Sequence, residues 1–278
     1  MKPYDLHSHS YYSDGTDSPS ELVKNAKAAG LSLIALSDHD TVLGVSEAVA
    51  AGKELHIGVL PAIEFDAQFE TELHILGYGI DIFHPSIVAH EEDASARRVK
   101  RNGEILKKLE AAGLHVTPYL EHSKGNDTRL HFARALMLAG YADTVRNAFD
   151  LYLKRGGAGY VESVRPMPKR VIEIIHEAGG LAVLAHPKKL KADVHTVVRE
   201  LCSYGLDGIE AHYPLSSDGE IALFVSLAKQ HGLFVTCGSD HHGTNRKNAQ
   251  LGSAWRDVPE LEQTYDLLAA QYLAKREI

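Results

Sequence analysis

Short apolar segments alternate with helix-like segments along most of the 278-residue chain. One helix has a clear start, because Ser18 can cap it, Pro19 fits its first position and Glu21 completes a capping box. This alternation is typical of an α/β fold built on a parallel sheet. Apolar runs typical of buried strands occur at 31–36, 58–63, 72–78, 180–185, 208–211 and 233–237.

The alternation stops between residues 89 and 163. A long charged helix is expected from 89 to 112, and shorter helical segments at 130–138 and 144–153 follow it. No strand pattern is visible in this part of the sequence. We therefore predict a β/α scaffold formed by residues 1–88 and 164–278, with a helical cap inserted at 89–163.

The net charge and the composition exclude some classes of function. The formal net charge of −8 argues against a general electrostatic grip on nucleic acid, although a local basic pocket is compatible with it. The basic run at 97–101 is expected to be a solvated helix face or a funnel for an anionic substrate.

No apolar run approaches the roughly 20 residues of a membrane span, and the N-terminus lacks the apolar core of a signal peptide. With only Cys202 and Cys237, both expected as reduced thiols, we predict a cytoplasmic protein.

Histidine and carboxylate side chains occur at or near the ends of almost all the apolar runs, in a chain that contains 17 histidines. His7 and His9 are two residues apart, so on extended backbone their imidazoles point to the same side and can reach one ion. One such pair is weak evidence, but the pattern recurs along the chain. The nine candidate ligands are His7, His9, Asp14, His39, Glu64, His74, His186, Asp240 and His242.

These residue types indicate the chemistry. Nitrogen and carboxylate donors without thiolates suit Mn²⁺, our first choice, or Zn²⁺ or Fe²⁺. Nine ligands exceed the needs of one ion, so we expect two or three ions with a bridging carboxylate. Such ions generate hydroxide near neutral pH and stabilise charge on a phosphoryl group. Asp5, Asp38 and Asp40 are expected to orient the ligand imidazoles.

The motifs resemble those of the polymerase-and-histidinol-phosphatase (PHP) family. The matching segments are Asp5-Leu6-His7-Ser8-His9, Ser13-Asp14-Gly15, Ser37-Asp38-His39-Asp40, Glu64, Leu73-His74-Ile75-Leu76-Gly77-Tyr78, Ala185-His186-Pro187 and Gly238-Ser239-Asp240-His241-His242. The resemblance implies a distorted (β/α)7 barrel, a trinuclear metal site and phosphoesterase activity.

The resemblance also implies how the ligands divide among the ions. It assigns His7, His9, Glu64 and Asp240 to one ion. Glu64 would bridge to a second ion held with His74 and His186. Asp14, His39 and His242 would hold the third, and we predict these three as catalytic residues. His241 is expected outside the ligand set, and so is His212, because the segment from Glu210 to Pro214 exchanges the aromatic residue and the histidine that many relatives have there.

The segments 128–134 and 152–161 resemble the cap of a PHP subgroup that acts on nucleotides. That resemblance implies phosphatases of nucleoside monophosphates or 3′,5′-bisphosphates, some of which also trim short 5′-phosphorylated RNA. It makes Arg129, His131 and Arg134 candidates for phosphate binding, with helix capping or surface ion pairing as the alternative. Lys188 and Lys189 replace the Gly-Arg that often follows the His-Pro motif, which keeps a cation but loses a bidentate donor.

We therefore predict a metal-dependent phosphoesterase that hydrolyses phosphate monoesters of nucleotides by a metal-activated hydroxide attacking phosphorus in line. Its expected partner is a small phosphorylated substrate, with short RNA as a further substrate, and neither a membrane nor an obligate protein partner is inferred. One alternative is a phosphatase of another small metabolite such as histidinol phosphate. The other is a non-catalytic module that uses metal only for stability.

Overall fold

The computed structural model describes residues 2–124 and 127–273. Its strands form one seven-stranded sheet in chain order. Neighbouring strands are parallel except around β4, which is antiparallel to both β3 and β5. The parallel sheet expected from the sequence therefore contains one reversed strand. The strands are β1 (Tyr4–Asp5), β2 (Leu33–Leu36), β3 (Gly58–Asp66), β4 (His74–Tyr78), β5 (Leu181–Leu184), β6 (Gly208–His212) and β7 (Phe234–Cys237).

The sheet curls until its two edges come together. Beyond the paired strands, Ser8 forms a parallel bridge with His241, and the Leu6 N–H donates to the Cys237 carbonyl at 3.1 Å. A further bond joins the Asp240 N–H to the His7 carbonyl at 2.9 Å. The sheet is thus a nearly closed barrel, which confirms the predicted distorted (β/α)7 architecture.

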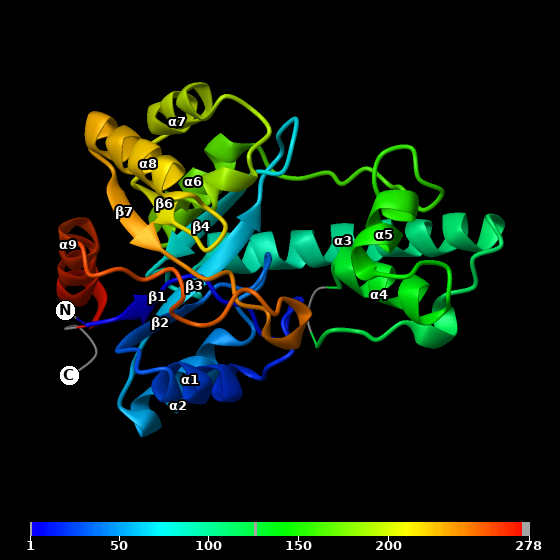
Figure 1. Cartoon of the computed structure of the whole chain (residues 1–278), viewed down its shortest axis with the longest axis horizontal. Coiled ribbons are helices and arrows are strands. Elements are labelled where there is room, and N and C mark those ends of the chain that lie inside the picture. The colour runs from blue at the N-terminus through cyan, green and yellow to red at the C-terminus, as the bar shows by residue number, and fades with distance from the viewer. Residues whose placement is uncertain (1, 125–126, 274–278) are drawn as a thin grey trace.

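Helices surround the outside of this sheet (Figure 1). The capping box predicted for the first helix is present, since Ser18 Oγ accepts from the Glu21 N–H and the Glu21 carboxylate accepts from the Ser18 N–H. The helices of the barrel are α1 (Pro19–Ala28), α2 (Val45–Leu55), α6 (Pro168–Glu177), α7 (Val194–Ser203), α8 (Asp218–His231) and α9 (Pro259–Leu268), with short turns η3 (Pro187–Lys189), η4 (Gly243–Asn245) and η5 (Ala269–Leu273). None of the helices in the described ranges is long and apolar enough to span a membrane.

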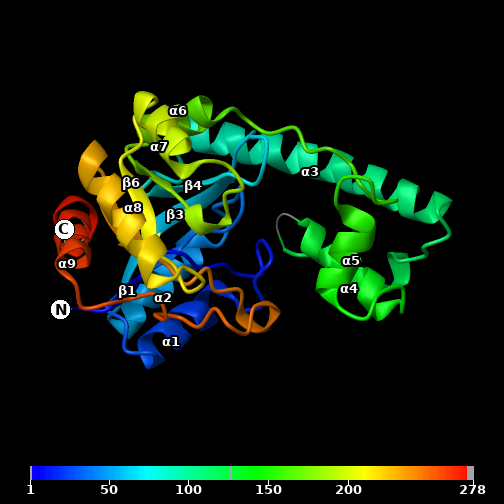
Figure 2. The same cartoon turned by 45° about the horizontal axis from the view of Figure 1, so that its top comes forward.

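The remaining helices form a lobe that projects from one side of the barrel (Figures 1 and 2). The long helix starts earlier than predicted, because the His84 side chain caps it and Pro85 fits its first turn. The lobe has its own buried core, which includes Ile105, Phe132 and Leu136. The division into two domains at 89 and 163 stays a prediction. The elements of the lobe are α3 (Pro85–Ala111), η1 (Thr117–Tyr119), α4 (Arg129–Leu138), α5 (Val145–Ala148) and η2 (Phe149–Leu153).

Candidate metal centre and substrate pocket

The nine predicted ligands converge on one end of the barrel. Their positions are set by the strands: His7 and His9 follow β1, His39 follows β2, Glu64 lies near the end of β3, His186 follows β5, and Asp240 and His242 follow β7. His74 is the first residue of β4 rather than the last. Because β4 is reversed, His74 pairs with Asp66 at the end of β3 and so lies at the same end of the barrel.

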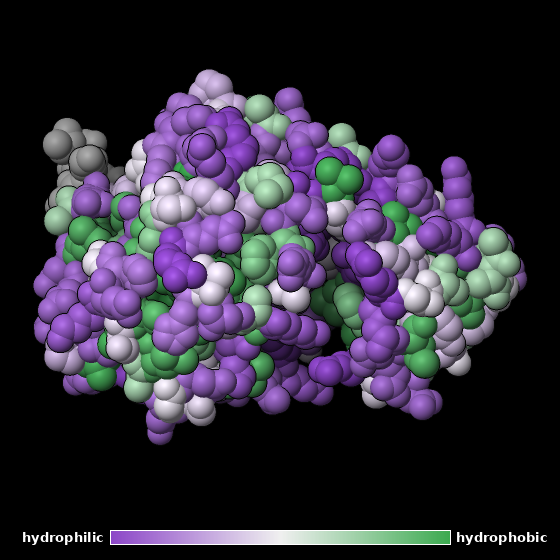
Figure 3. Space-filling view, turned by 90° about the horizontal axis from the view of Figure 1, so that it is seen from above, coloured by the Kyte–Doolittle hydropathy of each residue, from purple (hydrophilic) through white to green (hydrophobic). Residues whose placement is uncertain are grey.

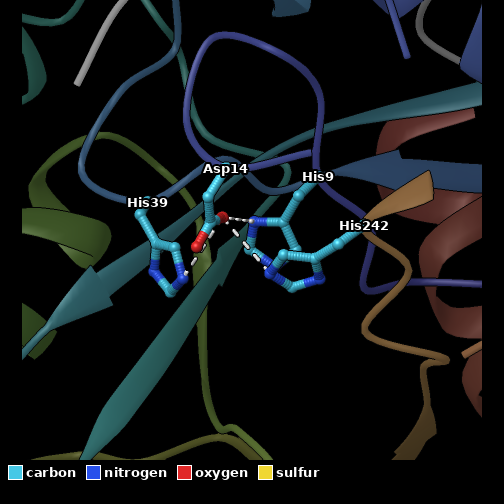
Figure 4. A group of neighbouring side chains, drawn as sticks. All are labelled: His9, Asp14, His39 and His242. Carbon is cyan, nitrogen blue, oxygen red and sulfur yellow. Dashed lines mark ion pairs between the residues drawn. The ribbon is translucent and has the colours of Figure 1, made fainter. Parts of the chain in front are cut away.

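Asp14 reaches the group from a loop. The turn after Ser10 folds it back, since the Ser13 and Gly15 N–H groups both donate to the Ser10 carbonyl. Its carboxylate lies between His39 on one side and His9 and His242 on the other (Figure 4). The Asp14 Oδ1 atom is 3.2 Å from His242 Nε2. This loop therefore supplies a carboxylate that no strand end provides.

Glu64 connects two halves of the cluster. Its Oε2 atom lies 3.2 Å from His7 Nε2 and 3.3 Å from His9 Nε2. Its Oε1 atom lies 2.8 Å from His74 Nδ1 and 2.9 Å from His186 Nε2. The Oε2 atom also lies 3.2 Å from His39 Nδ1. The two carboxylate oxygens thus face different imidazoles, which is the arrangement that a bridging ligand between two ions requires.

The donor atoms of the cluster gather into small groups whose members lie within 4.8 Å of one another. All nine predicted ligands belong to at least one group. The assignment of three ions to these ligands stays a prediction, and Glu72 joins one group without having been predicted. The groups are His9, Asp14, His39 and His242; His7, His9 and Asp240; His7, Glu64 and His186; His39, Glu64 and His74; and Glu72, His74 and His186.

Several imidazoles are held by a second contact that fixes their orientation. His7 Nδ1 donates to Glu210 at 3.0 Å, which leaves Nε2 to face Glu64. His74 Nε2 lies 3.1 Å from Asp66, while its Nδ1 faces Glu64. His242 Nδ1 bonds a backbone carbonyl at 2.8 Å. Such contacts set the ring tautomer, and they are usual around histidine that binds metal.

The carboxylates and imidazoles of the cluster shift one another's pKa values. Burial alone would raise the pKa of Glu64, but the imidazoles of His7, His74 and His39 outweigh it and hold that pKa well below its usual range. Burial alone would lower the pKa of His7 and of His74, but Glu210 beside His7 and Glu64 beside His74 raise both well above the usual range. Burial, together with Lys189, lowers the pKa of His186 to about 3. Because a neutral imidazole is the form that binds a cation, an ion would displace the protons of His7 and His74.

Buried atoms without hydrogen bonds indicate where a cation would bind. Among the described residues, His7 Nε2, His9 Nε2 and Glu64 Oε2 are fully buried and make no hydrogen bond. Buried polar atoms of this kind are rare, because each costs free energy unless something satisfies it. Glu64 Oε2 lies 3.2 Å from His7 Nε2 and 3.3 Å from His9 Nε2, so one divalent ion would satisfy all three atoms. The residues therefore fit a metal centre.

The backbone around the centre is strained. His186 and Asp240 have φ values of +27° and +56°, and Asp40 nearby has +53°. Residues with side chains rarely adopt these angles, and each costs on the order of 1–3 kcal/mol. Hydrogen bonds hold two of them in place, since the His186 N–H donates to Glu210 and the Asp240 N–H donates to the His7 carbonyl. The strained backbone thus costs stability, but it positions these predicted ligands.

The expected role of Asp5 and Asp38 in orienting ligand imidazoles is wrong, and that of Asp40 stays a prediction. Asp5 accepts backbone N–H groups of three loops, including that of His7. Asp38 accepts from Ser10 and Ser13, and Asp40 binds His90 and Arg98. Asp5 and Asp38 thus hold the loops that carry the predicted ligands.

Glu210 and Asp66 orient imidazoles in their place. Sequence analysis missed both. Glu210 is a fully buried acid inside the apolar strand β6, and Asp66 ends a strand that is longer than predicted. A lone carboxylate within an apolar run was the signal that could have found Glu210, since a buried acid needs a partner.

A cavity of about 360 Å³ opens over the cluster. It lies where the molecular surface is hollowed between the barrel and the lobe (Figure 3). Its walls combine metal-type side chains such as Asp14, His39, His74 and His242 with the arginines Arg98, Arg101, Arg129, Arg165 and Arg246. Arg98 and Arg165 both contact Asp66, which links this cationic wall to the ligand His74.

The predicted phosphate-binding residues occupy different places. Arg129 lines the cavity and donates to the Val161 carbonyl at 2.6 Å. His131 Nδ1 accepts the Thr128 N–H at 3.1 Å and so caps α4, and Arg134 donates to Asn245 at 2.6 Å.

Lys189 and Lys188 point in different directions. Lys189 donates to Asp240 at 2.8 Å, and the half-exposed Lys188 pairs with Glu220 on α8. The roles of Lys188 and Lys189 in substrate binding stay predictions, as do those of the three cap residues.

Comparison with known proteins decides the family. A model described as "PHP domain" matches residues 5–162, which is more than half of the chain. The chain belongs to the PHP family. It is 36% identical over 249 residues to a 5′-3′ exoribonuclease of Haemophilus influenzae, covering 87% of this chain and 90% of that protein. It is also 31% identical over 270 residues to a 3′,5′-nucleoside bisphosphate phosphatase of Chromobacterium violaceum, covering 94% of each.

A solved structure agrees with this PHP assignment. The structure of an amidohydrolase from Chromobacterium violaceum with bound sulfate and no metal superposes with a TM-score of 0.87 at 30% identity, covering 97% of this chain and 96% of that one. A putative metal-dependent phosphoesterase from Bifidobacterium adolescentis superposes with a TM-score of 0.81 at 27% identity, covering 97% of this chain and 96% of that one. This PHP protein is thus a metal-dependent phosphoesterase, and the alternative of a non-catalytic module is excluded.

Proposed function

We propose that this PHP phosphoesterase hydrolyses phosphate esters of nucleotides that carry a second phosphate, with nucleoside 3′,5′-bisphosphates as preferred substrates over AMP. The observation that supports this is the cluster of four arginines, Arg98, Arg101, Arg129 and Arg165, in the wall of the cavity over the ligand cluster. One phosphate would be held at the metal ligands, and the second needs a separate cationic site.

Arg98 is paired with Asp40 and Asp66, whereas Arg101, Arg129 and Arg165 repel one another in the free protein. Burial, together with Arg98 and Arg129, lowers the pKa of Arg101 to about 9. Burial and Arg165 likewise lower the pKa of Arg129. A bound phosphate would relieve this repulsion, and planar guanidinium groups donate paired hydrogen bonds to its oxygens. The cluster is therefore suited to an anion that is additional to the one at the metals.

The metal ligands would hold two or three ions, with Mn²⁺ as the first candidate and Zn²⁺ or Fe²⁺ as alternatives. When bound, these ions supply a hydroxide nucleophile and stabilise negative charge on the phosphoryl oxygens. In this proposal Glu210 and Asp66 orient the imidazoles, Asp14, His39 and His242 face the open cavity beside the reacting phosphate, and the arginines hold the second phosphate.

The names of the relatives agree with a nucleotide substrate, since one is a bisphosphate phosphatase and another an exoribonuclease. The rival substrate is a small phosphate monoester such as histidinol phosphate, which has no second phosphate for the arginines. Relative values of kcat/KM distinguish the nucleotide substrate from histidinol phosphate. With added Mn²⁺, kcat/KM should be highest for adenosine 3′,5′-bisphosphate, lower for AMP and lowest for histidinol phosphate.

A variant pair tests the role of the arginines directly. Arg129→Gln should lower kcat/KM for the bisphosphate by about 10- to 100-fold, the loss of one or two charge-assisted hydrogen bonds of roughly 1.5–3 kcal/mol, and lower that for AMP much less. Arg146→Gln is the matched control, because Arg146 is a solvated arginine of the same lobe. Equal losses on both substrates, or turnover of histidinol phosphate alone, would overturn the proposal.

A further inference from the structure

A second cavity of about 220 Å³ adjoins the catalytic cavity. The two share three wall residues, namely Arg129, Phe149 and Arg165. The second cavity lies between the loop from β3 to β4, the turn η2 and the chain that returns from the lobe at 160–165. Sites for separate small ligands usually measure roughly 300–1,000 Å³. The second cavity is smaller than that, so it is suited to one part of a ligand that already occupies the first.

The walls of the second cavity carry cations and aromatic rings. Four basic residues, which include Lys154 and Arg155, outnumber the two acidic ones, Glu70 and Glu162. This positive surface stands out in a chain with a net charge of −8. Aromatic rings are contributed by Phe69, Phe149 and Tyr160.

The cations are held only by weak contacts. Arg155 pairs with Glu162 at 3.2 Å, and Lys154 pairs with Asp150 at 3.4 Å, both on the surface. Exposed ion pairs contribute roughly 0–1 kcal/mol, so a phosphate can replace the carboxylate at little cost. The Arg155 guanidinium also lies over the ring of Tyr160, with 5.9 Å between them. A cation beside an aromatic face is the combination that binds single-stranded nucleic acid, because any base can stack on the ring.

We propose that this second cavity is a subsite for the second nucleotide of a short oligonucleotide, with Tyr160 as a stacking surface and Lys154 and Arg155 as contacts to the phosphate on the 3′ side of that nucleotide. The proposal rests on the proposed function, since the first nucleotide must occupy the arginine-lined cavity. It adds that the protein acts on chains longer than one nucleotide and that residues of the lobe, not of the metal centre, select for length.

Two variants test the subsite, and both residues line only the second cavity. Tyr160→Leu keeps an apolar side chain but removes the ring, and Lys154→Ala removes a cation. For the wild-type protein with Mn²⁺, kcat/KM should rise at least 10-fold from adenosine 3′,5′-bisphosphate, pAp, which fills the first cavity, to the dinucleotide pApAp. Either variant should remove most of that gain and change kcat/KM for pAp by less than 2-fold. Tyr119→Leu is the matched control, because Tyr119 is a half-exposed tyrosine of the same lobe that lines neither cavity.

Binding provides a second measurement that does not depend on turnover. Analogues of pAp and pApAp with hydrolysis-resistant phosphonate groups should bind the wild-type protein with at least a 10-fold difference in Kd, and Tyr160→Leu should remove most of the difference. Equal binding of the two analogues would overturn the subsite even if nucleotides are hydrolysed. Tighter binding of the pApAp analogue without turnover of any nucleotide would instead overturn the proposed function and leave the subsite intact.

Discussion

Glu210 is the residue that joins the ligand cluster to the barrel wall. Both of its carboxylate oxygens lie near His7 Nδ1, at 3.0 and 3.2 Å, and one of them also accepts the backbone N–H of His186. Gly238 makes room for this contact, because a side chain there would lie 2.2 Å from Glu210 and 2.3 Å from the Cβ of His7. One buried carboxylate thus positions two ligands from different strands.

Replacing Glu210 should therefore damage the metal centre without removing a ligand. Glu210→Gln keeps the shape of the side chain but loses the charge that aligns His7, and partners of this kind typically contribute 10- to 100-fold to metal affinity or activity. We expect phosphatase activity to fall by about that factor, together with the metal content measured by elemental analysis. Glu200→Gln, on the exposed face of α7, is the control. Unchanged metal content and activity in Glu210→Gln would show that His7 needs no such partner.

The sequence predicted which histidines gather at the cluster better than it predicted the carboxylates that orient them. Histidines at strand ends are unusual enough to be recognised by residue type and spacing, as for His7 and His9. Glu210 and Asp66 support their histidines from other strands, and only the closed sheet brings them together. Asp5 and Asp38 lie close to the predicted ligands in sequence, but their carboxylates accept hydrogen bonds from loops instead.

At the scale of elements, the periodicity of the sequence could not reveal that strand β4 is reversed. Apolar periodicity shows that a strand exists but not its direction, so His74 was predicted at the correct site within an incorrectly parallel strand. The start of α4 is a second such element. Thr128 caps α4 and its hydroxyl also lies 3.4 Å from Asp14 Oδ2, which brings the lobe into contact with the ligand cluster.

A pair of cap variants separates these two roles of Thr128. Thr128→Ala and Ser18→Ala each remove a side-chain cap with a capping box, so both should lower the free energy of unfolding by about 0.5–2 kcal/mol. Only Thr128→Ala also removes a contact to Asp14, and we expect it alone to reduce kcat, by several-fold. Thermal unfolding and steady-state kinetics on the two proteins check this. Equal kcat values for both variants would mean that α4 does not position Asp14.

At the scale of the whole molecule, the lobe and the barrel meet around the catalytic cavity. Contacts from the lobe side include Arg134 to Asn245, which in turn donates to the Asp14 carbonyl at 2.8 Å. The sequence predicted both parts, because their patterns differ, and the family resemblance predicted the use of the cavity between them. It did not predict the cationic wall, since Arg98, Arg101 and Arg165 come together only when α3 and the returning chain pack side by side.

Metal removal should destabilise the whole barrel. The ligands come from almost every strand, and the buried atoms of His7, His9 and Glu64 have no hydrogen bonds to replace the ion. An ion that binds only the folded state adds about 2.7 kcal/mol at a concentration 100 times its Kd. For a domain of this size that corresponds to a rise in Tm on the order of 5–10 °C.

Thermal unfolding in EDTA and in increasing Mn²⁺ measures this stabilisation. Tm should rise with the Mn²⁺ concentration over the same range that restores activity, because both depend on occupancy of one centre. Glu64→Gln should lose most of the rise, since it weakens the carboxylate that faces both pairs of imidazoles, whereas Glu70→Gln on the neighbouring loop should keep it. If Tm were the same in EDTA and in saturating Mn²⁺, the nine residues would not be the site that the ion occupies.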